Sequence, residues 1–385
     1  MNSIWLNKNP PKTLSTDYLI LGGGISGLGM AHWLSKEKGE CIVLEKNTLA
    51  SGATGRNAGF LSTGSLGLFN SMVSKYGLEQ SLRMRQFYKT NHELLVKEII
   101  QKNKKLDYQK TGSLSLLFDK NEENYCDLVS ALNDNGFNFK YLSAQDVNEF
   151  GITGSLGGFL DLDDGQIHSY KLIKHLEKTL LKTGRTKIFE NEETIEIQDN
   201  QVRTNQYIIK FKKLIYATNA YTPLLLPQIK EYIKPIRGQM LALEPGEKFI
   251  PHNIYASKML CYFRQLPQGE LIIGGFRTLN EKDEVGYDDS TSDIIQNAFE
   301  GFIKTHMPKL ANRKVTHRWG GTMAFTFDEN PLVGEIKPDH FLLGGYQGHG
   351  MGKAFACAEA LANLILKGTP VPDFIDINRI ELKNN

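Results

Sequence analysis

Cysteine is scarce in this chain of 385 residues, and the four present, Cys41, Cys126, Cys261 and Cys357, are far apart. No Cys-x-x-Cys pair or Cys/His cluster has the spacing that structural zinc or a redox dithiol requires. The sequence therefore predicts no metal site, and it favours reduced thiols in the cytoplasm.

An excess of charge of one sign and long apolar runs are also lacking. The 45 Lys and Arg residues nearly balance 43 Asp and Glu residues, which leaves a formal charge of +2. Such a balance provides no basic surface for nucleic acid. No stretch approaches the ~20 apolar residues that cross a bilayer, and the N-terminus lacks the apolar core of a signal peptide. We expect a cytoplasmic protein with no nucleic-acid partner and no transmembrane segment, and loose membrane contact stays open.

Glycine, in contrast, is placed where it carries information. Residues 17–36 read DYLILGGGISGLGMAHWLSK, a short apolar run followed by glycines and an amphipathic segment. Gly22, Gly24 and Gly27 fall in G-x-G-x-x-G register. Such a turn brings the backbone and a helix N-terminus close to a pyrophosphate. The pattern predicts a strand at 17–21, a phosphate-binding turn and a helix.

A second strand and an acid complete this nucleotide-binding unit. Cys41 to Leu44 reads as a buried strand, and Glu45 follows it, 18 residues beyond Gly27. A carboxylate at that distance accepts hydrogen bonds from a ribose diol, and it disfavours a ribose with a 2'-phosphate. The unit alone does not distinguish NAD from FAD, because both carry an ADP half.

The next segment, NTLASGATGRNAGFLSTG at 47–64, is rich in glycines and small residues well beyond Glu45, which gives a flexible backbone. Its GRNAG sequence resembles the FAD-dependent oxidoreductases of the D-amino-acid oxidase (DAO) family, and it is most similar to the amine-oxidising branch with glycine, sarcosine and gamma-glutamylputrescine oxidases. Further blocks resemble the family in family order, at 111–117, 164–176, 214–227, 236–245, 269–277, 318–335 and 342–355.

The resemblance implies an α/β fold, with a Rossmann-like FAD-binding domain and an inserted α+β substrate domain built on an antiparallel sheet. We expect the discontinuous FAD-binding domain to comprise 1–80, 145–225 and 315–385, and the substrate-binding domain 81–144 and 226–314. A second strand-glycine-helix unit follows Phe341, with a helix from about Met351 to Lys367 that Gly368 closes. In the family the corresponding turn lies beside the flavin ring.

The expected cofactor contacts come from both ends of the chain. The predicted FAD-binding residues are Gly22, Gly24, Ile25, Ser26, Gly27, Glu45, Lys46, Arg56, Asn57, Ala58, Gly59, Leu61, Thr194, Ala217, Thr218, Gly345, Gly348, His349, Gly350 and Met351. Family members that attach flavin covalently use Cys or His, whereas the matching stretches here offer Thr54, Gly55, Thr322 and Met323. The sequence therefore predicts non-covalent FAD.

The chemistry that the resemblance implies is hydride transfer from the carbon next to an amine nitrogen to the flavin, which gives an imine that water hydrolyses. His349, Tyr262 and Arg264 are the predicted catalytic residues. Members that act on simple α-amino acids carry an arginine shortly after the W-x-G motif, where Met323 stands here. This difference favours an amine or an N-substituted amino acid, with Arg264 or Arg277 as the alternative anchor of a carboxylate.

Several alternatives stay open from the sequence. The oxygen-activating lysine of sarcosine-oxidase-like members is replaced near Ile272, so the electron acceptor is oxygen, a quinone or a carrier protein. A D-amino-acid or glycine oxidase or dehydrogenase is one other function, and a non-catalytic flavin-bearing assembly factor is another. An NAD-dependent dehydrogenase is the rival from the residues alone, and a yellow purified protein would decide against it.

Overall fold

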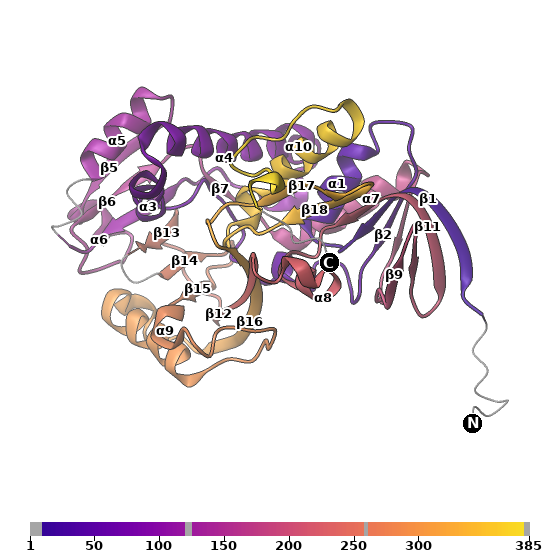
Figure 1. The fold of residues 1–385 in the computed structure, drawn as a ribbon. Helices are drawn as coiled ribbons and strands as arrows, with labels where there is room; N and C mark the ends of the chain where they lie inside the picture. The colour runs from indigo at the N-terminus through magenta and orange to yellow at the C-terminus, as the bar shows by residue number, and fades with distance from the viewer. Residues whose placement is uncertain (1–9, 120–124, 258–260, 381–385) are drawn as a thin grey trace.

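The computed structural model describes residues 10–119, 125–257 and 261–380. Most of its strands form two eight-stranded sheets that lie side by side (Figure 1). A small two-stranded pairing joins β3 (Phe60–Leu61) to β7 (Gly165–Gln166). This architecture confirms the predicted α/β fold with a second, largely antiparallel sheet.

The first sheet is parallel at its centre. Its main path has the order β17-β18-β11-β1-β2-β8, in which β17 runs antiparallel to β18 and the others run parallel. These strands are β1 (Lys12–Leu21), β2 (Cys41–Leu44), β8 (Thr186–Phe189), β11 (Tyr207–Tyr216), β17 (Leu332–Lys337) and β18 (His340–Gly344). The hairpin of β9 (Glu196–Gln198) and β10 (Gln201–Arg203) extends β11.

Apolar runs form the central strands because both faces of this sheet are covered. Ile20 and Val43 face one core cluster, whereas Leu19 and Ile42 face another. Helices α1 (Ile25–Leu34), α4 (Leu78–Glu98), α7 (Ser169–Lys182) and α10 (Ala354–Lys367) pack on the first of these faces. The Trp33 indole N–H of α1 donates to the Phe355 carbonyl of α10 at 3.1 Å, which ties the two ends of the chain together.

The second sheet has the order β16-β12-β15-β14-β13-β4-β6-β5. Neighbouring strands are antiparallel except for β13 and β4, which pair in parallel. Its strands are β4 (Ser113–Leu117), β5 (Phe139–Ser143), β6 (Gly157–Asp161), β12 (Ile233–Leu243), β13 (Asn253–Ala256), β14 (Cys261–Gln265), β15 (Leu271–Gly275) and β16 (Val315–Thr326). Phe299 and Phe302 of α9 (Asp293–His306) pack into the core of one face.

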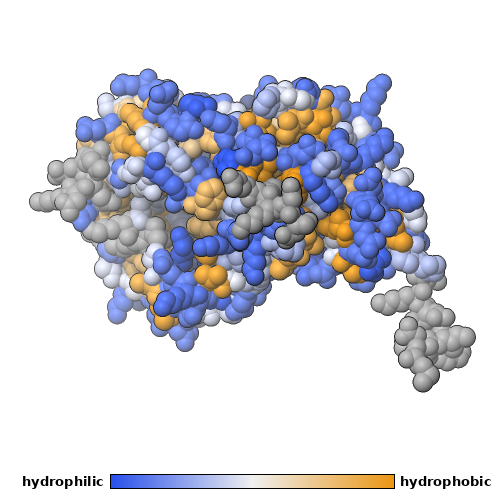
Figure 2. Space-filling model, in the orientation of Figure 1, coloured by the Kyte–Doolittle hydropathy of each residue, from blue (hydrophilic) through white to orange (hydrophobic). Residues whose placement is uncertain are grey.

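The remaining elements are short. The other helices are α2 (Ala53–Arg56), α3 (Leu66–Tyr76), α5 (Tyr125–Asp134), α6 (Ala144–Glu149) and α8 (Thr222–Leu225). The 3-10 turns are 100–102, 104–106, 219–221, 227–229, 277–280, 308–310, 350–352 and 377–379. Among the described residues, none of the helices combines the length and apolarity needed to cross a bilayer. On the face in Figure 2, hydrophobic residues form separate patches between hydrophilic ones.

Three element boundaries differ from the sequence predictions. The strand predicted at 17–21 begins at Lys12, because β1 pairs with β11 from that residue onward. The helical pattern of the sequence from Leu82 to Ile100 predicts a helix there, and the structure has it as α4, which runs from Leu78 to Glu98. The C-terminal helix begins at Ala354 rather than near Met351, since a 3-10 turn precedes it. Gly368 closes that helix in the left-handed conformation, as predicted, with φ of 67°.

The strand pairing of the second sheet includes two strands from ranges predicted for the FAD-binding domain. β6 lies within 145–225 and β16 lies within 315–385, the ranges predicted for the FAD-binding domain. Their hydrogen bonds place both strands in the second sheet, where β6 pairs with β4 and β16 pairs with β12. The boundaries themselves stay a prediction. The chain crosses between the two sheets more often than the sequence indicated, because strand partners far apart in sequence leave no local signal.

Candidate functional site

A cavity of about 1120 Å³ lies where the carboxyl ends of the first sheet meet the second sheet. Its lining includes most of the predicted cofactor residues, namely Gly22, Gly24, Ile25, Ser26, Glu45, Lys46, Arg56, Asn57, Ala58, Gly59, Thr194, Ala217, Thr218, Gly348, His349, Gly350 and Met351. Gly27, Leu61, Gly345 and Arg264 do not line it. The fold thus brings both ends of the chain to one cavity, at the edge where parallel sheets bind ligands.

The first glycine turn has the geometry that a pyrophosphate needs. Gly22 has φ of +110°, which residues with a side chain rarely adopt. A Cβ on Gly27 would lie 1.8 Å from the Gly22 carbonyl oxygen, so only glycine lets α1 approach the turn this closely. Gly24, the N-cap residue of α1, has no side chain to accept from the first N–H groups, and of these the Ile25 N–H donates to Thr54 Oγ1 at 3.1 Å. The first turn of α1 therefore faces the cavity with its remaining backbone N–H groups and a positive partial charge.

Glu45 holds this turn from the end of β2. Its Oε2 accepts a hydrogen bond from the Gly23 N–H at 2.8 Å, and its Oε1 accepts one from the Asn47 N–H at 2.9 Å. Each carboxylate oxygen keeps a further lone pair, and the residue lines the cavity. The side chain therefore combines a structural role with the acceptor that a ribose diol requires.

Removing this carboxylate gives a direct test of the adenosine end. We expect Glu45→Ala to weaken FAD binding about 10- to 100-fold, because hydrogen bonds to a charged group contribute about 1.5–3 kcal/mol. Titration of the flavin-free protein with FAD, followed by flavin fluorescence, measures the change. Glu193→Ala is the matched control, because Glu193 also lines the cavity but is half exposed and pairs with Lys46 at 2.8 Å. An equal loss in both variants would show that only the overall charge matters.

Three side-chain contacts hold the turns around the cavity in place, and the first of them joins the N-terminal turn to the C-terminal one. The Ser26 hydroxyl donates to the Tyr346 hydroxyl at 3.0 Å, and the Gly345 N–H donates to Asn219 Oδ1 at 3.0 Å. The Ile25 N–H donates to Thr54 Oγ1 at 3.1 Å. Gly345 therefore supports the cavity from behind rather than lining it. Sequence reasoning missed Thr54, Asn219 and Tyr346 as supports, because each acts on a partner far away in the chain.

His349 lies in the cavity wall as a neutral ring. Its Nδ1 lies 2.8 Å from the Gln347 carbonyl oxygen, which only accepts hydrogen bonds, so Nδ1 carries the proton and Nε2 a lone pair. Burial, with the nearby Lys353 charge, lowers the pKa of His349 to about 4. The ring stacks on Tyr255 with centroids 6.5 Å apart. At neutral pH His349 therefore accepts a hydrogen bond but does not hold a second proton.

The other two predicted catalytic residues lie in different places. Tyr262 lines the cavity, its ring lies edge-on to Phe60, and burial raises its pKa to about 12. Arg264 is 5% exposed and lies behind the GRNAG turn, where its Nη2 donates to the Ile167 carbonyl at 3.2 Å. A Cβ on Gly59 would lie 2.7 Å from that nitrogen. Tyr262 thus reaches the cavity, whereas Arg264 supports its wall.

Arg277, the alternative anchor, does line the cavity. Its guanidinium lies 4.7 Å from the Phe325 ring centroid, a cation–π contact. The other Lys and Arg side chains of the lining are paired, Lys46 with Glu193 and Arg56 with Asp289 at 2.7 Å. In the part of the chain that the structure describes, Arg277 has no ion pair. It is therefore the cation best placed to meet an anionic group of a ligand.

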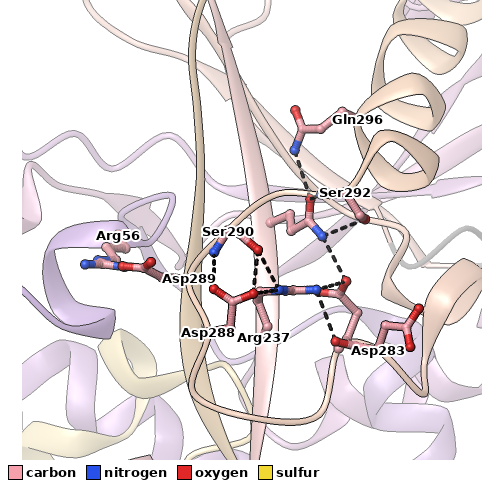
Figure 3. Close-up of polar contacts among 10 residues, drawn as sticks. Arg56, Arg237, Asp283, Asp288, Asp289, Ser290, Ser292 and Gln296 are labelled. Atoms are coloured by element: carbon pink, nitrogen blue, oxygen red, sulfur yellow. Dashed lines mark hydrogen bonds and ion pairs between the residues drawn. The ribbon is translucent and has the colours of Figure 1, made fainter.

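A polar network fixes the loop that ends beside this cavity (Figure 3). Arg237 of β12 is 6% exposed and pairs with Glu284 at 2.8 Å and with Asp288 at 3.0 Å. The next residue, Asp289, pairs with Arg56 of α2. A loop of the second sheet thereby holds the GRNAG turn of the first, and Arg56 is engaged in this contact rather than free for a ligand.

These features fit FAD in particular. The lining combines a glycine turn and an acid with the His349 turn, and its walls are largely buried. Within the described ranges, no group of three or more His, Cys, Asp or Glu side chains is arranged to hold a metal ion. All four cysteines are free thiols.

Comparisons with known proteins agree with this geometry. The family model described as "DAO: FAD dependent oxidoreductase" matches residues 17–364. The chain is 25% identical over 371 residues to the probable oxidoreductase OrdL of Rhizobium meliloti (strain 1021), with 92% of this chain and 84% of that protein covered. It is 24% identical over 376 residues to gamma-glutamylputrescine oxidoreductase of Escherichia coli (strain K12), with 92% and 84% covered. The crystal structure of L-proline dehydrogenase from P. horikoshii matches with a TM-score of 0.77 at 25% identity, covering 95% of this chain and 96% of that one.

Proposed function

Because the chain belongs to the DAO family of FAD-dependent oxidoreductases, which act on amines and amino acids, we propose that its substrate is an amine or N-substituted amino acid. The reaction is oxidation of a C–N bond, and of these two classes we favour the N-substituted amino acid, because Arg277 can bind its carboxylate. The bound FAD supplies the acceptor for a hydride from the carbon next to the nitrogen. The chain's residues supply binding, orientation and the exclusion of water.

The FAD is held without a covalent bond in this proposal. Thr54 and Thr322 stand where a covalent link would need Cys or His, and the Thr54 hydroxyl already accepts from the Ile25 N–H. Cys261 lines the cavity, but burial raises the pKa of its thiol well above the usual value. A buried neutral thiol is a poor nucleophile. Denaturation with acid should therefore release all of the flavin into solution.

The position of Arg277 carries the proposal for the substrate. The Arg277 guanidinium lies over the ring of Phe325 on β16. Met323, two residues before Phe325 on β16, lies beside the His349 turn, because its Sδ would be 3.0 Å from a Cβ added to Gly348. Family members that use simple amino acids place an arginine on the strand that corresponds to β16, where this chain has Met323. Arg277, which follows β15, supplies an arginine to the cavity instead. His349 and Tyr262 line the same cavity, and we propose that the substrate nitrogen lies near the His349 Nε2 lone pair and the Tyr262 ring when the carboxylate is bound at Arg277.

Anaerobic reduction tests this proposal. We expect N-methyl amino acids or other N-substituted amino acids to bleach the flavin absorbance of the purified protein, and plain amines without a carboxylate to do so poorly. Gly and D-amino acids are the comparison, because the arginine position of family members that use them is Met323 here. Bleaching by none of these would favour the non-catalytic alternative, and bleaching by NADH alone would contradict the substrate class.

The same bleached protein identifies the class of electron acceptor. Ile272 is 7% exposed and packs with Ala58 and Met240 behind the turn, so no amine stands at that position to promote the reaction with oxygen. We therefore propose slow reoxidation by air and faster reoxidation by a quinone or a carrier protein. Stopped-flow recovery of the flavin absorbance compares the two rates, and fast recovery in air alone would identify an oxidase.

A further inference from the structure

Glu192 carries a buried carboxylate in the wall of the cavity. The residue is 3% exposed, lines the cavity and lies in the loop after β8. Its Oε2 has no hydrogen-bond partner in the part of the chain that the structure describes. The neighbouring cation, Lys46, pairs with Glu193 at 2.8 Å instead. Because a buried charged group is costly without a partner, this carboxylate indicates a hydrogen-bond donor that a ligand in the cavity supplies.

Backbone contacts hold the loop of Glu192 against the end of β2. The Glu192 N–H donates to the Glu45 carbonyl oxygen at 2.9 Å, and the Asn191 N–H donates to the Asn47 carbonyl oxygen at 2.7 Å. In the opposite direction, the Glu45 N–H donates to the carbonyl oxygen of Phe189, the last residue of β8, at 2.9 Å. The two acids therefore line one cavity from loops that are fixed to each other.

The order of the strands indicates which part of FAD lies at Glu192. In the first sheet β1, β2 and β8 are consecutive and parallel, so their carboxyl ends lie in a row. The glycine turn expected at the pyrophosphate follows β1, and Glu45, the expected acceptor for the ribose diol, follows β2. Glu192 follows β8, one strand further out. Beyond the ribose, the next part of the cofactor is its adenine base.

The polar groups of this loop match the edge of adenine. Adenine has an amino group, which donates hydrogen bonds, next to the ring nitrogen N1, which accepts them. The Glu192 carboxylate is an acceptor for the amino group. Thr194 also lines the cavity, and its backbone N–H, which has no partner among the residues that the structure describes, is a donor for N1. Hypoxanthine has a carbonyl oxygen and an N1–H in these places, so it opposes both groups.

We propose that Glu192 is a specificity-determining residue for the cofactor, whose carboxylate accepts a hydrogen bond from the adenine amino group of FAD. Glu45 then binds the ribose and Glu192 binds the base, so the two acids have separate roles. This contact involves neither the flavin ring nor the substrate. The inference therefore goes beyond the proposed function and does not depend on which amine or amino acid is oxidised.

FAD and its hypoxanthine analogue, in which a carbonyl oxygen replaces the amino group, test this contact. Both ligands carry the same flavin and ribose, so titration of the flavin-free protein, followed by flavin fluorescence, measures both affinities. We expect wild type to bind FAD about 100-fold more tightly, because the analogue places an oxygen against the carboxylate and leaves it unpaired. Glu192→Gln should reduce this ratio at least tenfold, since an amide can rotate to donate to the carbonyl oxygen.

Three further variants separate the base from the ribose and from overall charge. Glu192→Ala should weaken FAD binding about 10- to 100-fold and leave binding of the analogue unchanged or stronger. Glu45→Ala should weaken both ligands by the same factor, because their ribose is identical. Glu193→Ala is the matched control: this adjacent acid is half exposed and pairs with Lys46, so the variant should keep the wild-type ratio. Each ratio compares two ligands on one preparation, so partial loss of folding does not change it.

Two results would overturn the inference. An equal loss of both ligands in Glu192→Ala would show that the carboxylate meets the ribose, and no loss of either ligand would show that it meets neither part of the cofactor. Flavin that no N-substituted amino acid reduces would instead contradict the proposed function, because these titrations involve no reduction.

The stability of the flavin-free protein provides a second readout. Without FAD the Glu192 carboxylate has no partner, so flavin-free Glu192→Gln should be at least as stable as flavin-free wild type in a denaturant titration. Loading with FAD should raise the unfolding midpoint of wild type more than that of the variant, because wild type binds FAD more tightly. A flavin-free variant that is less stable than wild type would indicate a structural role for the carboxylate, which contradicts the proposal.

Discussion

Gly27→Ala is expected to leave the purified protein without flavin. The added Cβ would lie 1.8 Å from the Gly22 carbonyl oxygen, a backbone atom that moves only if the whole turn moves. Helix α1 would have to retreat from β1, and its first N–H groups would then no longer face the part of the cavity where we expect the pyrophosphate to bind. The ratio of flavin to protein absorbance after purification, and FAD titration of the variant, measure the loss, which we expect to exceed 100-fold, or about 2.7 kcal/mol.

Gly29→Ala, two residues further along the same helix, is the matched control. Its added Cβ would lie 3.1 Å from Cδ2 of Phe355 and 3.6 Å from Ala358, so only side chains need to adjust. This variant should retain FAD with a small change in stability. Circular dichroism separates loss of flavin from loss of folding, because β1 and α1 belong to the core. A Gly27→Ala protein that binds FAD like wild type would contradict the packing explanation.

The part of the site nearest to Gly27 is also the part that the sequence predicts best. The strand at 17–21, the glycines and Glu45 lie within 29 residues, and each has a local physical reason for its identity. Glycine is required by a positive φ or a close approach, and the strand at 41–44 is apolar because both of its faces are buried. Such constraints act between close neighbours, so they are visible in the sequence.

The substrate side was harder to predict, since it depends on partners that are remote in the chain. Tyr255 reaches the cavity because β13 pairs in parallel with β4, about 140 residues earlier, and no local pattern announces that pairing. Tyr262 and Arg264 share one face of β14, yet the GRNAG turn covers Arg264 and leaves Tyr262 in the cavity. The alternation of side chains along β14 therefore does not show that Arg264 is buried, whereas the packing of the GRNAG turn against it does.

Arg277→Met is expected to cause the largest loss of activity among the proposed substrate contacts. Methionine keeps much of the apolar contact with Phe325 but removes the charge. Losing one partner of a partly buried charge pair costs about 2–3 kcal/mol, which corresponds to about a 30- to 160-fold lower kcat/KM for a carboxylate substrate. Because a binding interaction made before the chemical step is lost, most of the change should appear in KM. Steady-state kinetics, or anaerobic flavin reduction at several substrate concentrations, measure it.

Two comparisons separate carboxylate binding from a general disturbance of the wall. An uncharged amide or ester of the same substrate should react equally with wild type and Arg277→Met, because neither protein then forms the ion pair. Arg277→Lys should recover only part of the affinity, since an ammonium group offers a point charge but not the paired donors of a guanidinium. Arg264→Met should weaken FAD retention rather than raise KM, since Arg264 bonds the Ile167 carbonyl behind the turn. An equal rise of KM in Arg264→Met and Arg277→Met would mean that any disturbance of the cavity wall weakens substrate binding. The substrate carboxylate would then be bound by a residue other than Arg277.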